Sequence, residues 1–145
     1  MAHWTIRQLQ SADYSGLIGL WQSAELPFKP EGRDAQAAFE RQLAQPMTIY
    51  LGAFRNDELI GAVLGTHDGR KGWINRLAVH PAHRGQGMGR ALVESVEAHL
   101  GEQGIEIVAA LIEDGNETSW EVFTALGYVH HPDIHYRSKR AHPDV

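Results

Sequence analysis

Apolar residues in the N-terminal third of the chain follow one strand pattern and two helical patterns. Residues 5–9 predict a strand, and Ser11 precedes apolar residues at helical spacing, which predicts an N-capped first helix. Residues 24–33 contain two prolines and a glycine, so they are expected to form a loop. Good helix formers fill residues 34–45, and Pro46 ends this second predicted helix.

The next apolar runs are continuous, and they predict the centre of a sheet. Residues 48–54 and 59–65 are rich in apolar and β-branched side chains. They are separated by Asn56-Asp57, which favours a tight turn and therefore predicts a hairpin. A third run, residues 73–79, is expected to be the central strand.

In the C-terminal half, apolar residues again recur at helical spacing. Residues 88–100 carry apolar side chains three and four positions apart, and Gly104 is a plausible cap for this helix. Residues 105–112 are so continuously apolar that a strand inside the sheet is expected. Another helix is predicted over residues 116–126.

Two short strands are expected at the end of the chain, around Val129 and over residues 134–137, before a loose tail. The elements then follow the order β-α-α-β-β-β-α-β-α-β-β. This order predicts a single α/β (α+β) domain over residues 1–145.

Composition narrows the class of protein. The chain has 145 residues, a net charge of −5 and no cysteine, so disulfides, thiolate nucleophiles and cysteine-ligated metals are excluded. The acidic balance argues against nucleic-acid binding, which depends on many basic residues. Neither an apolar signal core nor a membrane-length apolar run is present, so a cytoplasmic location without membrane attachment is expected.

A turn rich in glycine joins the central strand to the long helix. Gly85, Gly87 and Gly89 allow close approach of the backbone to a bound group, and the first N–H groups of a helix have no internal partner. Residues 69–93 contain five Lys or Arg, two His and no Asp or Glu, although the chain is acidic. Taken separately, the glycines would be explained by a tight turn, and the basic residues by a solvated helix start. Together they predict a phosphate-binding helix start.

Two other phosphate-binding motifs do not fit this turn. A nucleotide P-loop requires Gly-Lys followed by Ser or Thr, whereas Gly89 is followed by Arg90 and Ala91. The dinucleotide fingerprint requires a third glycine or alanine where Arg90 stands, and its glycines should lie at the strand end. A dinucleotide-dependent oxidoreductase therefore ranks third among the possible functions.

The run from Arg84 to Gly89 resembles the acyl-CoA motif Arg/Gln-x-x-Gly-x-Gly/Ala of the GNAT family of N-acetyltransferases, and Leu77 to Pro81 is similar to the strand ending of that family. The resemblance implies the GNAT fold, with a mixed central sheet of about six to seven strands and helices on both faces, and acetyl-CoA as co-substrate. It also implies that backbone groups of Leu77, Ala78 and Val79 contact the pantetheine, and that the pyrophosphate is held by N–H groups of Arg84, Gly85, Gln86, Gly87, Met88 and Gly89.

A second segment, residues 116–128, is similar to the Asn-x-x-Ala-x-x-x-Tyr-x-x-x-Gly-Phe segment of the family. Asn116 is then expected to cap a helix, to contact the pantetheine, or both. Phe123 stands where many members have a tyrosine that protonates the leaving thiolate, and it would contribute only to acyl-CoA binding. Ser119 and Tyr136 are candidate replacement acids.

A general base is harder to identify. In relatives, a glutamate often lies at the positions held here by Trp73, Arg76 and Leu111. Glu113, with Asp114 beside it, is the nearest remaining acid, although both residues also fit a solvated loop. Backbone N–H groups at the point where the two buried strands, residues 73–79 and 105–112, separate would polarise the thioester carbonyl without any side chain.

The resemblance implies an acetyl-CoA-dependent acyltransferase that acts on a primary amine of a small molecule or peptide. By analogy, Glu25 and Asp34 approach the acceptor, although charged loops are often only solvated. A non-catalytic acyl-CoA-binding domain is the alternative. We expect no metal, and a monomer or homodimer.

Overall fold

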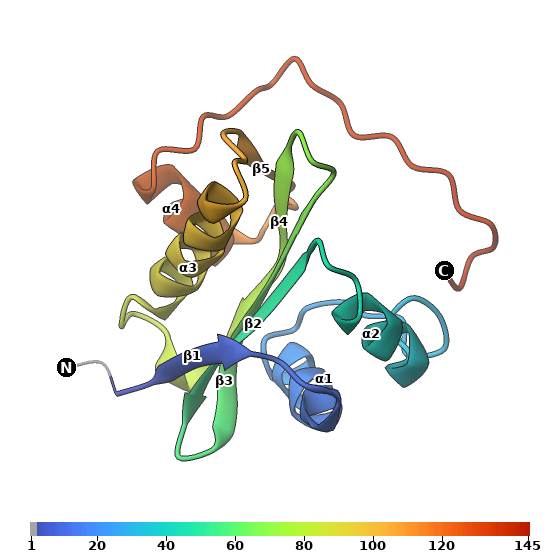
Figure 1. Cartoon of the computed structure of the whole chain (residues 1–145), viewed down its shortest axis with the longest axis vertical. Helices are drawn as coiled ribbons and strands as arrows, with labels where there is room; N and C mark the ends of the chain where they lie inside the picture. The colour runs from blue at the N-terminus through green and yellow to red at the C-terminus, as the bar shows by residue number, and fades with distance from the viewer. Residues whose placement is uncertain (1–2) are drawn as a thin grey trace.

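The computed structural model describes residues 3–145, in which helices flank both faces of a central sheet (Figure 1). The elements in chain order are β1 (Thr5–Gln8), a 3-10 turn (Ser11–Asp13), α1 (Tyr14–Ser23), α2 (Gln36–Leu43), β2 (Thr48–Arg55), β3 (Glu58–His67), β4 (Gly72–Val79), a second 3-10 turn (Pro81–His83), α3 (Met88–Glu102), β5 (Val108–Ala110) and α4 (Glu117–Ala125). The α+β class and the predicted order of elements through α4 are confirmed.

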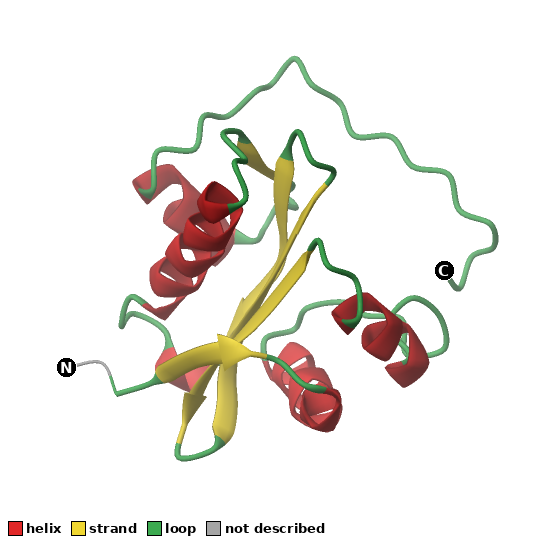
Figure 2. Ribbon diagram, in the orientation of Figure 1, coloured by secondary structure: helices red, strands yellow, loops and turns green. Residues whose placement is uncertain are grey.

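The sheet has five strands in the order β1-β2-β3-β4-β5 (Figure 2). Neighbouring strands from β1 to β4 are antiparallel, and β5 runs parallel to β4. Asn56 and Asp57 have φ values of 51° and 65°, as a two-residue hairpin turn with two left-handed residues requires. This turn confirms the hairpin that the sequence predicted.

Both faces of the sheet are buried, which explains why its central strands are continuously apolar. Along β2, Ile49 and Leu51 belong to a core cluster on the face covered by α3 and α4. Tyr50 and Phe54 point to the opposite face and pack with residues of α1 and α2. Successive strand residues alternate between two cores, so each of them is apolar.

The strand expected inside the sheet over residues 105–112 is wrong in length and in position. Only Val108–Ala110 pair with β4, and β5 forms the edge of the sheet in the part of the chain that the structure describes. Ile107 and Leu111, on either side of β5, are 53% and 51% exposed. The prediction failed because a continuous apolar run does not show whether another strand pairs with the outer edge of β5, and within residues 3–145 none does.

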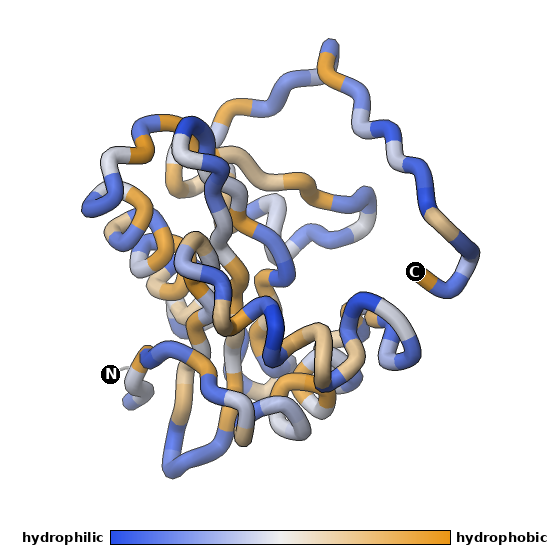
Figure 3. The backbone as a smooth tube through the Cα atoms, turned by 45° about the vertical axis from the view of Figure 1, so that its right-hand side comes forward, coloured by the Kyte–Doolittle hydropathy of each residue, from blue (hydrophilic) through white to orange (hydrophobic). Residues whose placement is uncertain are grey.

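The two strands expected around Val129 and over residues 134–137 are also wrong, so the sheet has five strands and not six to seven. Residues 129–145 contain no helix or strand and follow an extended path across one end of the sheet (Figure 1). Much of this path is hydrophilic (Figure 3), and Pro132 has no N–H for a strand ladder. Val145 accepts a hydrogen bond from Arg33 Nη1 at 3.2 Å, beside the loop between α1 and α2.

The first helix begins later than the N-cap prediction for Ser11 requires. Ser11 starts a 3-10 turn, and its hydroxyl donates to Glu40 Oε1 at 2.5 Å. The backbone N–H of Gln10 donates to Asp13 Oδ2 at 2.7 Å, so the carboxylate of Asp13 stabilises this turn. In residues 3–145 no helix combines the length and the hydropathy needed to span a bilayer.

Candidate active site

The end of β4 separates from β5 and leaves part of its backbone free to bind a ligand. The ladder pairs Gly72–Ile74 with Val108–Ala110 and stops there in the described chain. Two residues later, Arg76 adopts a left-handed φ of 57°, where the register between β3 and β4 shifts. A bulge of this kind bends the strand and re-aims its groups. Residues 77–79 therefore have no β5 partner.

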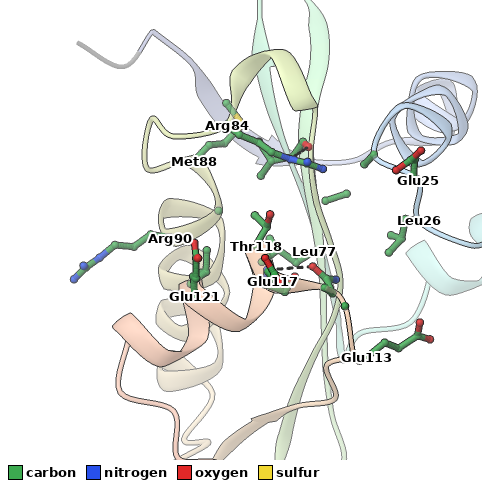
Figure 4. A pocket seen from close by; sticks show the side chains of 18 of the residues that line it. Glu25, Leu26, Leu77, Arg84, Met88, Arg90, Glu113, Glu117, Thr118 and Glu121 are labelled. Carbon is green, nitrogen blue, oxygen red and sulfur yellow. Dashed lines mark hydrogen bonds between the residues drawn. The ribbon is translucent and has the colours of Figure 1, made fainter.

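A cavity of about 620 Å³ opens beside this part of β4 (Figure 4). Three segments line it. The first is the loop that follows α1, and the second runs from the end of β4 through the glycine-rich loop (residues 84–87) to the start of α3. The third is the β5–α4 loop with the first turns of α4. The site thus brings together residues that lie far apart in the sequence. Its size is within the range of small-molecule and cofactor sites.

The glycine-rich loop has the geometry of an anion site. Gly85 and Gly87 have φ values of 77° and 82°, and nothing lies within 4 Å of the position of a Cβ atom at either residue. Gly87 is the N-cap of α3, whose first N–H groups have no partner inside the helix. Arg84 Nε donates to the carbonyl of Val79 at 3.2 Å, which ties this loop to the end of β4. Backbone donors and a cation therefore lie together at this end of the cavity.

The start of α4 forms another wall of the cavity. Asn116 Oδ1 accepts a hydrogen bond from the backbone N–H of Ser119 at 3.2 Å, so the predicted helix cap is confirmed. Contact of Asn116 with a pantetheine stays a prediction. Ser119 lines the cavity but is only 6% exposed.

Charge is distributed unevenly around the cavity. His83, at the end of the second 3-10 turn, and Arg84, in the glycine-rich loop, line one part of the cavity, whereas Glu113 and Asp114 lie in the β5–α4 loop. Figure 4 shows Arg84 and Glu113 at opposite ends, with Glu25 on the side of α1. An anionic group is favoured near Arg84, and a cationic group is favoured near the carboxylates.

Glu25 is held in an unusual conformation where the chain leaves α1. Its φ of 58° is left-handed, and the N–H of the following Leu26 donates to the carbonyl of Trp21 at 2.9 Å. A left-handed conformation is unfavourable for a residue with a Cβ atom and is often found at functional sites. Here it places Glu25 and Leu26 at the cavity.

Arg76 lies behind this loop, at one of the positions where the sequence resemblance implied a carboxylate. Its Nη1 donates to the carbonyl of Pro27 at 2.6 Å, and its guanidinium stacks 4.1 Å from the ring centre of Trp21. Its Nε and Nη2 are buried without a hydrogen-bond partner among the described residues. Burial lowers the pKa of Arg76, because desolvation disfavours the charged form.

The structure brings most of the predicted site residues together. The cavity is lined by Leu77, Ala78, Val79, Arg84, Gly85, Gly87, Met88, Gly89 and Asn116 from the expected cofactor set, and by Glu113, Ser119 and Glu25 from the expected catalytic and acceptor sets. Their roles stay predictions.

Four predicted residues lie outside the cavity lining in the described chain: Gln86, Phe123, Tyr136 and Asp34. Phe123 is only 3% exposed and packs in the core, whereas Tyr136 is 71% exposed on the extended C-terminal segment. The carboxylate of Asp34 accepts the N–H of Lys29 at 2.7 Å and so stabilises its own loop. Phe123 lies outside the cavity because it is buried in the core, and Tyr136 lies outside it because it stands on the extended C-terminal segment.

Sequence reasoning missed several residues of the site. Leu26, Pro27 and Thr118 line the cavity. The prolines of the α1–α2 loop signalled a loop but not which of its residues would face a ligand. Arg55, at the end of β2, contacts the glycine-rich loop and carried no signal in the sequence.

The chain is similar to a known protein family and to several solved structures. The model of the acetyltransferase (GNAT) family matches residues 5–128. The PaiA N-acetyltransferase of Thermoplasma acidophilum, in complex with coenzyme A, superposes with a TM-score of 0.76 at 17% identity, covering 87% of this chain and 89% of that chain.

Two further structures show the same fold with different named activities. An aminoglycoside acetyltransferase from an uncultured soil metagenomic sample gives a TM-score of 0.80 at 19% identity, covering 97% of this chain and 100% of that chain. The ribosomal-protein-alanine N-acetyltransferase of Brucella melitensis biovar Abortus 2308 gives a TM-score of 0.73 at 20% identity, covering 94% of this chain and 98% of that chain. At such identities the likeness is one of fold.

Proposed function

The chain belongs to the acetyltransferase (GNAT) family, and from this premise we propose that it transfers an acetyl group from acetyl-CoA to a primary amine. One observation carries the proposal: the glycine-rich loop and the start of α3 lie at one cavity with the end of β4 that pairs with β3 but not with β5. This arrangement supports one continuous site in which the loop would supply donors for a pyrophosphate and β4 would supply donors for an acyl-pantetheine arm.

The residues present fit an acyl-CoA. The open space at Gly85 and Gly87 lets the loop backbone approach the pyrophosphate, and Arg84 supplies a positive charge. Backbone groups of residues 77–79 hold the pantetheine and polarise the carbonyl. When bound, acetyl-CoA supplies a thioester whose carbonyl carbon is attacked by a neutral amine and whose thiolate leaves.

The other end of the cavity receives the acceptor. Glu25, Glu113 and Asp114 attract an ammonium group, and Glu113 is the candidate to take a proton from it. Ser119, on the wall formed by α4, is the candidate to donate a hydrogen bond to the departing sulfur. The acceptor is a small molecule or a peptide with a primary amine.

Acetyl transfer is tested directly by thiol release from acetyl-CoA with a panel of amines, and mass spectrometry of the products checks the result. The panel covers amino acids, α-amines of peptides, lysine side chains, polyamines and aminoglycosides. We expect acetylation of at least one class. If CoA binds but no amine is acetylated, the catalytic proposal is wrong.

A non-catalytic acyl-CoA-binding domain is the second candidate, and one observation favours it. No tyrosine lines the cavity within residues 3–145, and Phe123, at the position where the family resemblance implies the acid, is buried outside the cavity lining. A thiol with a pKa of about 8.5, taking the value for cysteine, is still a tolerable leaving group without an acid. Catalysis therefore remains the better proposal.

We predict that α-amines are acetylated faster than lysine ε-amines of similar shape at pH 7. An α-amine with a pKa of about 7.7–8.0 is roughly one-tenth neutral at this pH, whereas an ε-amine with a pKa of about 10.4 is neutral in about one molecule in 2,500. Initial rates with a dipeptide amide and with Nα-acetyl-lysine amide measure the difference. The ratio of the α-amine rate to the ε-amine rate should fall between pH 7 and pH 9. Faster ε-amine acetylation at pH 7 would show that a strong base exists, with Glu113 as the first candidate.

Phe123→Tyr is expected to retain or increase the maximal rate while lowering stability. The side chain is buried, and its ring lies 4.8 Å from the ring of Tyr128. A buried hydroxyl without a partner costs about 1–3 kcal/mol. Steady-state rates and urea unfolding measure the two effects, with Phe123→Leu as the control that adds no hydroxyl. If the wild type is inactive and Phe123→Tyr is active, the natural protein is better described as an acyl-CoA-binding relative.

A further inference from the structure

Arg55 connects the β2–β3 hairpin to the glycine-rich loop. It is the last residue of β2, directly before the turn formed by Asn56 and Asp57. Its Nη1 lies 3.3 Å from His83 Nδ1, and its Nη2 donates to Gln86 Oε1 at 3.2 Å. Its Nε donates to the carbonyl of His3 at 3.1 Å. One side chain therefore uses three nitrogens to join three separate segments.

The two contacts with the loop lie on either side of Gly85. His83 ends the 3-10 turn before the loop, and Gln86 stands between the two left-handed glycines. These glycines give the free loop a large conformational freedom, which binding must remove. Interactions that fix a loop before binding reduce this entropic cost and so increase affinity. Arg55 is placed to fix the loop from outside the cavity.

The contact with His83 also determines the state of the imidazole. A guanidinium has only donors, so His83 Nδ1 must be the acceptor. The ring is then neutral and carries its proton on Nε2. Because His83 also lines the cavity, Arg55 controls which ring nitrogen can donate a hydrogen bond.

We propose that Arg55 is a positioning residue for the pyrophosphate of acyl-CoA: it holds the glycine-rich loop through Gln86 and fixes His83 as the Nε2–H tautomer. This inference rests on the proposed function, because it assumes that the loop binds the pyrophosphate. Arg55 itself does not line the cavity. Its effect on the ligand is therefore transmitted by the two loop residues.

Calorimetry with CoA tests the proposal. We expect Arg55→Met to weaken CoA binding about 10-fold, which corresponds to the loss of one or two hydrogen bonds. Arg55→Lys keeps the charge but cannot bridge two acceptors in one plane, so it should lose most of the same affinity. Arg70→Met, on the exposed β3–β4 turn, removes the same charge away from the loop and should bind CoA like the wild type.

The state of His83 gives a second readout that a merely structural role would not change. Long-range ¹H–¹⁵N spectra of the ligand-free protein should show only the Nε2–H tautomer in the wild type and a mixture of the Nε2–H and Nδ1–H tautomers in Arg55→Met, where no donor faces Nδ1. Equal CoA binding by wild type and Arg55→Met, full binding by Arg55→Lys, or an unchanged tautomer in Arg55→Met would each overturn the proposal. Failure of the wild type to bind CoA would instead overturn the proposed function itself, and the positioning role with it.

Discussion

Gly87→Asp is expected to weaken CoA binding at least about 100-fold while the protein remains folded, because like charges brought together in a binding site cost several kcal/mol. The new carboxylate would enter the open space at the N-cap of α3, where the pyrophosphate is expected. Calorimetry measures the affinity, and circular dichroism checks the fold. Wild-type binding should also fall as salt rises, since the charges are partly screened.

Gly69→Asp is the matched control for this variant. Gly69 has a φ of 85°, close to that of Gly87, and nothing lies within 4 Å of its Cβ position. It lies on the β3–β4 turn, so the substitution adds the same charge and a similar backbone strain away from the cavity. CoA binding should remain unchanged. If folded Gly87→Asp binds CoA as well as Gly69→Asp does, the assignment of the phosphate site is wrong.

Gly65→Ala is expected to lower the free energy of unfolding by about 1–3 kcal/mol, the usual cost of an overpacked core. A Cβ atom at this position of β3 would lie 2.4 Å from Val96 Cγ1 of α3. Valine in a helix has one strongly preferred rotamer, so its methyl group cannot turn away easily. Helix α3 would therefore have to shift. Urea unfolding monitored by circular dichroism measures the loss.

Two further variants test whether this steric contact is the cause. Gly19→Ala in α1 meets nothing within 4 Å and should be neutral or stabilising, because alanine favours helices over glycine. Val96→Ala removes the clashing methyl groups, so Gly65→Ala should cost less in that background. A Gly65→Ala protein as stable as the wild type would show that α3 adapts freely.

The sequence was most informative where local chemistry and burial agree. Asn56-Asp57 specifies its turn by itself, and the hairpin was predicted correctly. The spacing of residues 88–100 shows α3 because one face of this helix is fully buried. The glycine-rich loop was found for a similar reason, since both its conformation and its charge are local properties.

Contacts between distant segments were not predictable in this way. The apolar run of residues 105–112 looks the same whether or not a neighbouring strand covers it, so the edge position of β5 was missed. Phe123 and Tyr136 were assigned by spacing and residue type alone, which does not determine the direction of a side chain. Arg55 reaches the loop across the fold, and its partner Gln86 is 31 residues away.

Residues 77–79 of β4 have no β5 partner, and this limits which substitutions can change the chemistry of the protein. Main-chain groups are the same in every amino acid, so substitutions among Leu77, Ala78 and Val79 that preserve the strand would leave the proposed thioester contacts in place. Glu25 and Glu113, by contrast, belong to loops, which tolerate replacement, insertion and deletion more readily than strands do. A lineage with this arrangement can change its acceptor by mutating loops while it inherits the same chemistry at the strand.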